Sequence, residues 1–236
     1  TETPKVLHEV GGRCMLDYVL TACRQAGVGK MYVVVGYGAE QVRQRFSEAE
    51  DVVWVLQEQQ KGTADAVMCC GEYLKDFEGD TLILCGDGPL IRGETLKTLI
   101  GKHESENSAV TLATAILEEP GGYGRVVRDA YGNIEGIVED SDCDERQRQI
   151  KEVNPSYYLF DNRQLFAAIE KVEPDNVKGE YYLTDAVSIL IGSGQRVVAV
   201  TAVAPEEAMS VNSREQLSVV GQVMQGRIQR ELMARG

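Results

Sequence analysis

The chain has 236 residues, of which 43% are hydrophobic and 26% are charged, and its formal net charge is −13. This length is enough for one sizeable α/β core, and the acidic balance argues against a nucleic-acid partner, whose phosphates require a basic face. The apolar runs are strand-sized and the first residues are polar, so we expect no membrane span and no signal peptide. A cytoplasmic location is therefore the expected default.

Cysteine and histidine usage narrows the chemistry further. The six cysteines show no C-x-x-C spacing and are too sparse for a disulfide-stapled domain, so we expect reduced, mostly buried thiols. The two histidines, His8 and His103, are far apart in sequence. This disfavours a His-rich zinc site and a Ser-His-Asp or Cys-His hydrolase, and it favours catalysis by positioning and electrostatics.

The first half of the chain alternates helical and strand-like patterns. Apolar residues at helical spacing from Met15 to Cys23 predict a helix that Gly27 ends, and the apolar run over 31–35 predicts a strand. This alternation predicts βαβ units, right-handed crossovers and a mainly parallel sheet in a doubly wound α/β fold. The other strands expected here cover 52–56, 82–84 and 109–116. The other helical elements are an amphipathic segment over 41–46, a helix that begins at 62–63 and a second helix over 94–100.

The pattern changes after Pro120. The glycine-rich loop over 121–124 allows a backbone to approach a ligand closely, and the turn over 131–133 lies between two short β runs that predict a hairpin. We expect a small antiparallel β flap over 120–160, inserted into a single domain that spans 1–236. The elements expected after the hairpin are strands over 152–160 and 196–203, helices over 163–171 and 185–191, and a C-terminal helix over 213–236 that begins with Ser213 and Gln216 in capping-box spacing.

Asp87 is the first candidate for chemistry. The apolar run over 82–85 ends in a Gly-Asp-Gly-Pro turn, which delivers the Asp87 carboxylate to the carboxyl end of a strand, where open α/β sheets bind ligands. A lone Asp without a nearby His suits a hard cation such as Mg²⁺ and the phosphates that it carries. The alternative is that Asp87 only caps the turn.

The usual phosphate-binding motifs G-x-x-x-x-G-K-[ST] and G-x-G-x-x-G are both absent from the sequence. Eight other short motifs are spread along the chain, and each is weak alone. Coincidence is a poor explanation for eight such motifs in register. They are 4–8 (PKVLH), 56–57 with 62–64 (LQ and GTA), 86–90 (GDGPL), 122–126 (GYGRV), 136–139 (GIVE), 152–154 (EVN), 179–185 (GEYYLTD) and 211–214 (VNSR).

In this order the motifs resemble the uridyltransferase domain of bacterial bifunctional N-acetylglucosamine-1-phosphate uridyltransferases, the GlmU type, within the sugar-nucleotide pyrophosphorylases. The resemblance covers essentially the whole chain. It implies a Rossmann-like nucleotide-diphospho-sugar transferase fold and a Mg²⁺-dependent transfer of UMP from UTP to N-acetylglucosamine 1-phosphate, a step of cell-wall synthesis. It implies small-molecule substrates and no nucleic-acid or membrane partner, and it leaves a protein partner open.

The resemblance also implies roles for individual residues. A direct in-line attack of the sugar phosphate on the α-phosphorus requires an aligned oxygen and shielding of negative charge, which a cation and a lysine supply. On the phosphate side, Lys5 and Asp87 match catalytic residues, Lys5 also matches a phosphate contact, and Asp87 and Asn212 match Mg²⁺ ligands. On the nucleotide side, the matching residues are Gln57, Gly62 and Thr63 at the uracil and Gly86 beside the nucleotide. The residues that match the sugar pocket are Gly124, Glu139, Asn154, Tyr182 and Thr184.

The sequence departs from the family pattern inside three motifs. Cys85 stands where a Tyr often precedes Gly-Asp, residues 61–66 read KGTADA instead of the more usual GTGHA, and residues 154–156 read Asn-Pro-Ser instead of Asn-Thr-Gly. Pro155 removes a backbone donor near the expected sugar pocket. Since the GTADA run also occurs in glucose-1-phosphate nucleotidyltransferases, an enzyme for glucose 1-phosphate or for a different base is the alternative function.

The family's Gly-rich loop, L-x-x-G-x-G-T-R-M, lies upstream of the segment that matches 1–5, and its β-helix acetyltransferase domain lies downstream. Neither is in this chain, and we expect an upstream piece to belong to the protein. If the encoded protein lacks the loop, a non-catalytic nucleotide-sugar-binding regulatory subunit becomes the better interpretation.

Ordinary roles also exist for single residues. Lys5 as a solvated charge, Glu139 as part of an acidic patch, Asn154 as a turn former, Tyr182 as a core ring and Asn212 as a helix cap are the alternatives. Because they occur in register with Asp87, we favour a functional role for Lys5 and Asn212. For the sugar-side residues we favour neither the functional nor the ordinary role.

Overall fold

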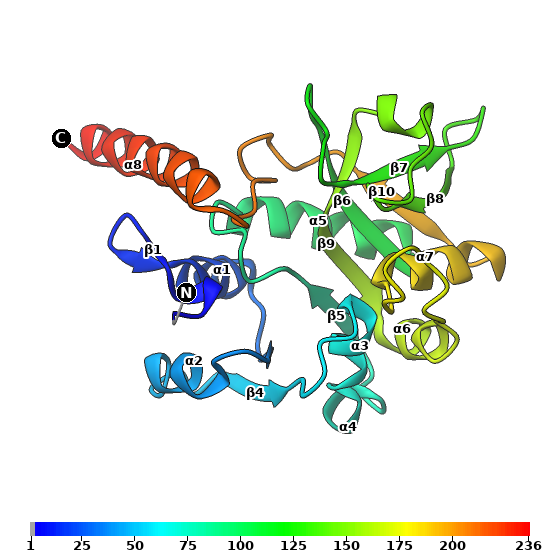
Figure 1. Ribbon diagram of the computed structural model, residues 1–236, viewed down its shortest axis with the longest axis horizontal. Helices are drawn as coiled ribbons and strands as arrows, with labels where there is room; N and C mark the ends of the chain where they lie inside the picture. Colours follow the sequence, from blue (N-terminus) through cyan, green and yellow to red (C-terminus); the bar gives the residue numbers. More distant parts are fainter. Residues whose placement is uncertain (1–2) are drawn as a thin grey trace.

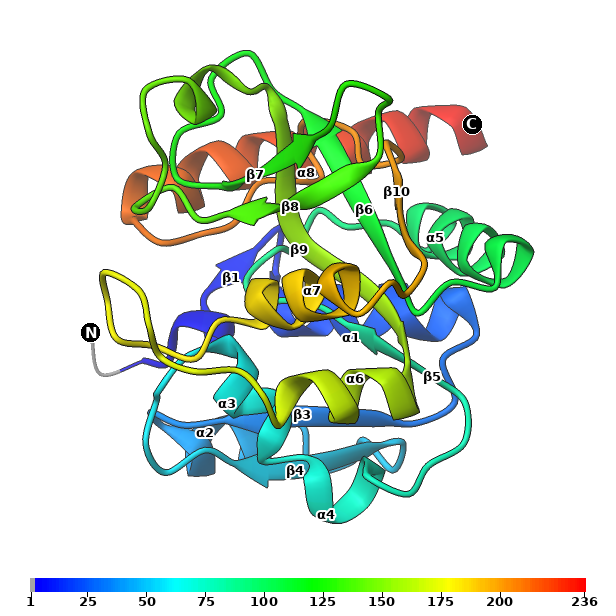
Figure 2. The same cartoon turned by 90° about the vertical axis from the view of Figure 1, so that its right-hand side faces the viewer.

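The computed structural model describes residues 3–236 (Figures 1 and 2). Its largest sheet has the strand order β10–β6–β9–β7–β8, and β5 also pairs with β9. A separate two-stranded sheet joins β3 to β4, and β1 pairs with β2. The strands are β1 (Glu9–Val10), β2 (Arg13–Cys14), β3 (Met31–Val35), β4 (Val52–Leu56), β5 (Asp80–Ile83), β6 (Val110–Ile116), β7 (Gly124–Arg128), β8 (Ile134–Val138), β9 (Glu152–Asp161) and β10 (Val197–Val200).

The helices follow the strands in the alternation that the sequence predicts. They are the 3-10 helices η1 (Lys5–Leu7) and η2 (Gln147–Gln149), and the α-helices α1 (Met15–Ala26), α2 (Ala39–Arg45), α3 (Thr63–Met68), α4 (Gly71–Leu74), α5 (Gly93–Glu106), α6 (Asn162–Ile169), α7 (Leu183–Gly192) and α8 (Arg214–Arg235).

Strand directions confirm the α/β class and the mainly parallel character of the sheet. Both β5 and β6 run antiparallel to β9, and β10 runs parallel to β6, so these three strands share one direction. Strands β3 and β4 are parallel to each other. The central exception is β9, which follows the β7–β8 hairpin without an intervening α-helix and therefore lacks the crossover that a parallel strand requires.

The two faces of β9 build two halves of the core. Tyr158 and Phe160 belong to a cluster with residues of α6 and α7, whereas Tyr157 and Leu159 belong to a cluster with residues of α1 and α5. This division follows from the two-residue period of a strand, which sends successive side chains to opposite faces. Neighbouring tyrosines at 157 and 158 are thus anchored in different layers.

The expected hairpin forms between β7 and β8, and β7 also pairs with the start of β9. It lies at the opposite end of the molecule from β3 and β4 (Figure 2). Because β9 continues from this hairpin into the central sheet, the flap and the core share a strand. The limits 120–160 for a flap within a single domain stay a prediction.

Helix α8 begins where the capping box predicts. The Ser213 hydroxyl accepts from the Gln216 backbone, and the Gln216 side chain accepts from the Ser213 backbone. The helix extends outward (Figure 1), and its Val220 and Met224 pack with Leu90 of the turn after Asp87.

The cysteines agree with the expectation of unpaired, mostly buried thiols. All six cysteines are free, and four of them are buried. Within residues 3–236, no helix combines the length and the apolar character that crossing a membrane would require.

Candidate functional site

Three segments that are distant in sequence meet at Lys5. Its Nζ atom lies 2.5 Å from Asp87 Oδ2, just after β5, and 2.8 Å from Asn212 Oδ1, just before α8. The Val211 backbone donates to the Asp87 carbonyl at 3.1 Å, so the two loops are joined through main-chain atoms as well. The structure therefore brings together the residues expected to serve the phosphates and the metal.

The donor set at this point suits a hard cation. A carboxylate oxygen and an amide oxygen converge on the single positive charge of Lys5, and such oxygens are the ligands that Mg²⁺ prefers. The part of the chain that the structure describes contains no cluster of three or more His, Cys, Asp or Glu side chains able to hold a metal. A cation held by Asp87 and Asn212 would therefore depend on phosphate oxygens and water for its other positions, as Mg²⁺ commonly does.

Glu207 supports the loop that carries Asn212. Its carboxylate, only 3% exposed, accepts from Thr95 Oγ1 at 2.6 Å and from the Arg92 backbone at 3.2 Å. Arg92 is the N-cap of α5, so the carboxylate satisfies one of the backbone donors at the start of that helix. Sequence reasoning did not single out Glu207, because no spacing relates it to a residue 112 positions away.

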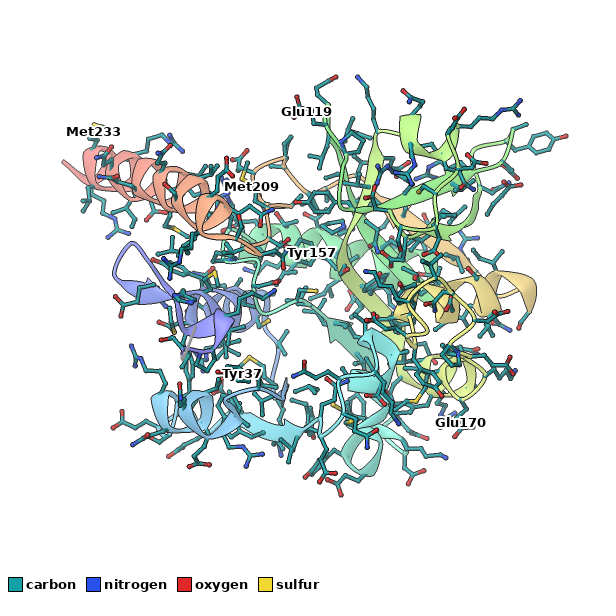
Figure 3. All side chains as sticks on the ribbon, in the orientation of Figure 1. Tyr37, Glu119, Tyr157, Glu170, Met209 and Met233 are labelled. Atoms are coloured by element: carbon teal, nitrogen blue, oxygen red, sulfur yellow. The ribbon has the colours of Figure 1, made fainter. Side chains whose placement is uncertain are left out.

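Two tyrosine hydroxyls also hold this loop. Tyr157 donates to the Glu207 carbonyl at 2.9 Å, and Tyr123 donates to the Ala208 carbonyl at 3.1 Å. Figure 3 shows Tyr157 near the middle of the molecule and Met209 on the loop that leads to α8. The strand core and the hairpin thus fix the position from which Asn212 projects.

A cavity of about 150 Å³ lies beside Asp87. It separates the turn after β5 from the start of the hairpin and from the middle of β9. Four of its lining residues are expected site residues, namely Asp87, Gly124, Glu139 and Asn154, and the remainder are Cys85, Gly88, Gly122, Tyr123, Pro155, Ser156, Tyr157, Ala208 and Ser210.

Two polar groups expected in the sugar pocket, Glu139 and Asn154, are held by neighbouring side chains. Thr184 Oγ1 donates to Glu139 Oε1 at 3.1 Å, and Asn154 Nδ2 donates to the Tyr158 hydroxyl at 2.5 Å. Desolvation by burial raises the pKa of Glu139 above its ordinary value. A Cβ at Gly124 would lie 3.0 Å from Ile137 Cγ2 and 3.6 Å from Glu139 Oε2, so this glycine allows the two strands of the hairpin to pack closely over the carboxylate.

The residues expected at the uracil lie on a loop outside the cavity lining. Gln57 Nε2 donates to Asp65 Oδ2 at 2.7 Å and to the Gly62 carbonyl at 3.2 Å. Thr63 Oγ1 accepts from the Leu183 backbone at 2.9 Å. Gly62 has φ +121°, and a Cβ there would lie 2.4 Å from the Tyr181 carbonyl, so only glycine permits this close approach. The loop is thereby fastened to the start of α7.

Gly86 and Tyr182 complete the expected set. A Cβ at Gly86 would lie 3.4 Å from Val6 Cγ1, which places this glycine against η1. Tyr182 is the N-cap of α7 and is buried. Like Thr184, it lies outside the cavity lining, and the ligand-binding roles of these residues stay predictions.

The site belongs to a known class of protein. A family model described as "Nucleotidyl transferase" matches residues 1–205, so the chain belongs to this family. A solved structure titled UDP-glucose pyrophosphorylase complexed with UDP-glucose superposes with a TM-score of 0.73 and covers 95% of this chain and 91% of its own. At 15% identity, this likeness shows the shared fold.

More similar sequences are proteins named "Bifunctional protein GlmU", which confirms the resemblance drawn from the motifs. The chain is 44% identical to the protein of Geobacillus sp. strain WCH70 and 42% identical to that of Geobacillus thermodenitrificans, in each case over 98% of this chain and 50% of the relative. It is 43% identical to the protein of Pelotomaculum thermopropionicum, over 100% of this chain and 51% of the relative. The chain thus spans about half the length of the curated relatives it matches.

Proposed function

We propose that the chain transfers UMP from UTP to N-acetylglucosamine 1-phosphate, giving UDP-N-acetylglucosamine and pyrophosphate in the cytoplasm. The observation that carries the proposal is the convergence of Lys5 and Asn212 on Asp87, which also lines the cavity. It occurs in a chain of the nucleotidyl transferase family that is 42–44% identical to bifunctional GlmU proteins. As in the sequence prediction, residues 1–236 act as a single nucleotidyltransferase domain with a sugar-side flap over 120–160.

On the phosphate side, Asp87 and Asn212 hold Mg²⁺ through oxygen atoms, and Lys5 contacts the triphosphate. The ion, when bound, supplies positive charge next to phosphate oxygens. The sugar phosphate attacks the α-phosphorus in line, and Lys5 shields the negative charge that accumulates there. This assignment asks no side chain to form a covalent bond.

On the nucleotide side, Gln57, Gly62 and Thr63 face the uracil, and Gly86 lies beside the nucleotide. Support comes from the attachment of the 57–63 loop, since the Gln57 amide and the Thr63 hydroxyl are fixed by Asp65 and Leu183. A base-binding loop held in this way selects by shape with little reorganisation on binding.

On the sugar side, Gly124, Glu139, Asn154, Tyr182 and Thr184 form the pocket. Gly124, Glu139 and Asn154 line the cavity, and Thr184 orients the Glu139 carboxylate. A carboxylate and an amide that are already held by neighbours suit the hydroxyl and acetamido groups of the sugar.

The test is pyrophosphate release measured with each of four nucleoside triphosphates and with N-acetylglucosamine 1-phosphate or glucose 1-phosphate, with and without a chelator. We expect UTP with N-acetylglucosamine 1-phosphate to give the highest kcat/KM, and chelation to abolish turnover. A preference for glucose 1-phosphate or another base would overturn the substrate assignment, and no turnover with any pair would overturn the enzymatic one.

A further inference from the structure

A β-bulge in β9 forms part of the cavity wall. Ala113 of β6 pairs with Tyr157, and Ala115 pairs with Val153, so the three residues 154–156 lie opposite Thr114 alone. All three line the cavity. Bulges of this kind redirect side chains near functional sites, and Pro155, which has no N–H, is tolerated because the regular ladder is interrupted there.

Ser156 adopts a backbone conformation that serine disfavours. Its φ is +65°, and in residues 3–236 the only other non-glycine residue with positive φ is Asn107, which ends α5. The Asn107 conformation is common for a helix C-cap, and asparagine tolerates it well. Ser156 is neither a helix C-cap nor an asparagine, and a glycine at this position would remove the strain. A strained residue in a cavity wall points to a function for its side chain.

The Ser156 hydroxyl has a weak hydrogen-bonding partner in the wall, unlike the neighbouring amide of Asn154. The Asn154 amide is engaged at both ends, because Oδ1 accepts from the Ser156 backbone at 3.2 Å and Nδ2 donates to the Tyr158 hydroxyl. The Ser156 hydroxyl interacts with two side chains of the wall, the Cys85 thiol and the Tyr158 hydroxyl. A thiol is the weaker of these two hydrogen-bonding partners, so a better donor or acceptor on a ligand can take its place at little cost.

Cys85 and Ser156 both line the cavity. The side chain at 85 and the hydroxyl at 156 therefore contribute together to the shape and the hydrogen-bonding capacity of the pocket.

We propose that Ser156 is a specificity-determining residue, whose hydroxyl forms a hydrogen bond with a polar substituent of the sugar ring of the sugar 1-phosphate. This inference rests on the proposed function. It predicts that the hydroxyl contributes to sugar-phosphate recognition and that the strained backbone is kept because of it.

The test compares Ser156→Gly with Ser156→Ala in the full-length protein. Both variants lack the hydroxyl, whereas only glycine relieves the backbone strain. We expect both to raise the KM for the preferred sugar 1-phosphate roughly 5–15-fold, the loss of about one hydrogen bond, with the KM for UTP unchanged. We expect only Ser156→Gly to raise the Tm, by about 2–4 °C.

Asn107→Gly is the matched control, since it relieves a positive φ on an exposed helix end far from the cavity. It should leave every KM unchanged. A sugar-phosphate KM within twofold of the wild type in both variants overturns the inference, as does a change in Ser156→Gly alone, which would assign the effect to the backbone. No turnover by the wild type overturns the proposed function and this inference with it, whereas turnover with unaltered KM values overturns this inference alone.

Discussion

The two sides of the cavity are built in different ways. On the phosphate side, Lys5 of η1 meets Asp87 and Asn212 from two separate loops, and the three are held by side-chain contacts, with Lys5 about half exposed. On the sugar side, Asn154 projects from the paired strand β9 and Glu139 directly follows β8, and their partners Tyr158 and Thr184 are buried. The exposed Lys5 can change partners without disturbing the core, whereas groups bonded to buried side chains cannot.

This contrast predicts its largest effect for Asp87→Ala. Loss of this proposed metal ligand should lower kcat/KM roughly 10³-fold, or by about 4 kcal/mol, because the negative charge on the transferred group is no longer compensated. The Tm should change by no more than about 3 °C, since the residue lies at a strand end and its ion pair is with a half-exposed lysine. Pyrophosphate release and a thermal melt check both, with Asp76→Ala on the exposed surface as the control.

Glu207→Ala tests whether the loop that carries Asn212 depends on a buried contact, in contrast to the exposed contacts of Lys5. The change leaves the Thr95 hydroxyl and the Arg92 backbone without their acceptor in a buried place, which should lower the free energy of unfolding by roughly 2–4 kcal/mol.

Urea denaturation measures the loss. The adjacent Glu206→Ala is the matched control, because Glu206 is 37% exposed and its ion pairs should contribute at most about 1 kcal/mol. Equal effects of the two substitutions would contradict the supporting role of Glu207.

Glu139→Gln tests the sugar side through the pH dependence of stability. Burial raises the folded-state pKa of Glu139 above its ordinary value near 4.5, so the folded state retains a proton that the unfolded state has lost. The contribution of this group to stability is therefore largest at low pH and declines as pH rises from about 4.5 through the raised pKa. Glutamine cannot titrate, and its carbonyl still accepts from Thr184.

Thermal melts across this pH range should show the Glu139→Gln variant gaining stability relative to the wild type as pH rises, with a plateau above the raised pKa. The KM for the sugar phosphate should rise at neutral pH, because the carboxylate no longer accepts from the sugar. A stability difference that is independent of pH would show that Glu139 titrates in the folded state as it does in the unfolded chain.

Ser213→Ala should have the smallest effect. Loss of the helix cap should destabilise α8 by about 1 kcal/mol, visible as a small loss of helicity on heating. The Gln216 side chain also accepts from the Asn212 backbone at 2.7 Å, so the cap and the proposed metal ligand share one support. Gln216→Ala should therefore raise the metal concentration needed for half-maximal turnover more than Ser213→Ala does.

The features that the sequence predicts well are those in which local pattern and global fold agree. The start of α8 follows from Ser213 and Gln216, and the position of Asp87 follows from an apolar strand that ends in a glycine turn. The antiparallel direction of β9, the buried carboxylate of Glu207 and the bulge at Ser156 depend on partners from distant parts of the chain. Periodicity and spacing carry no information about such partners, which explains why these features were missed.

The position of Lys5 has one more consequence. Its ammonium occupies the point at which the oxygens of Asp87 and Asn212 converge, so the lysine acts as a tethered competitor for any cation that these oxygens bind. A divalent ion must displace it, and an incoming triphosphate offers the displaced charge a new counterion. Metal and nucleotide should accordingly bind with positive cooperativity, and by thermodynamic reciprocity each should tighten the binding of the other by the same factor.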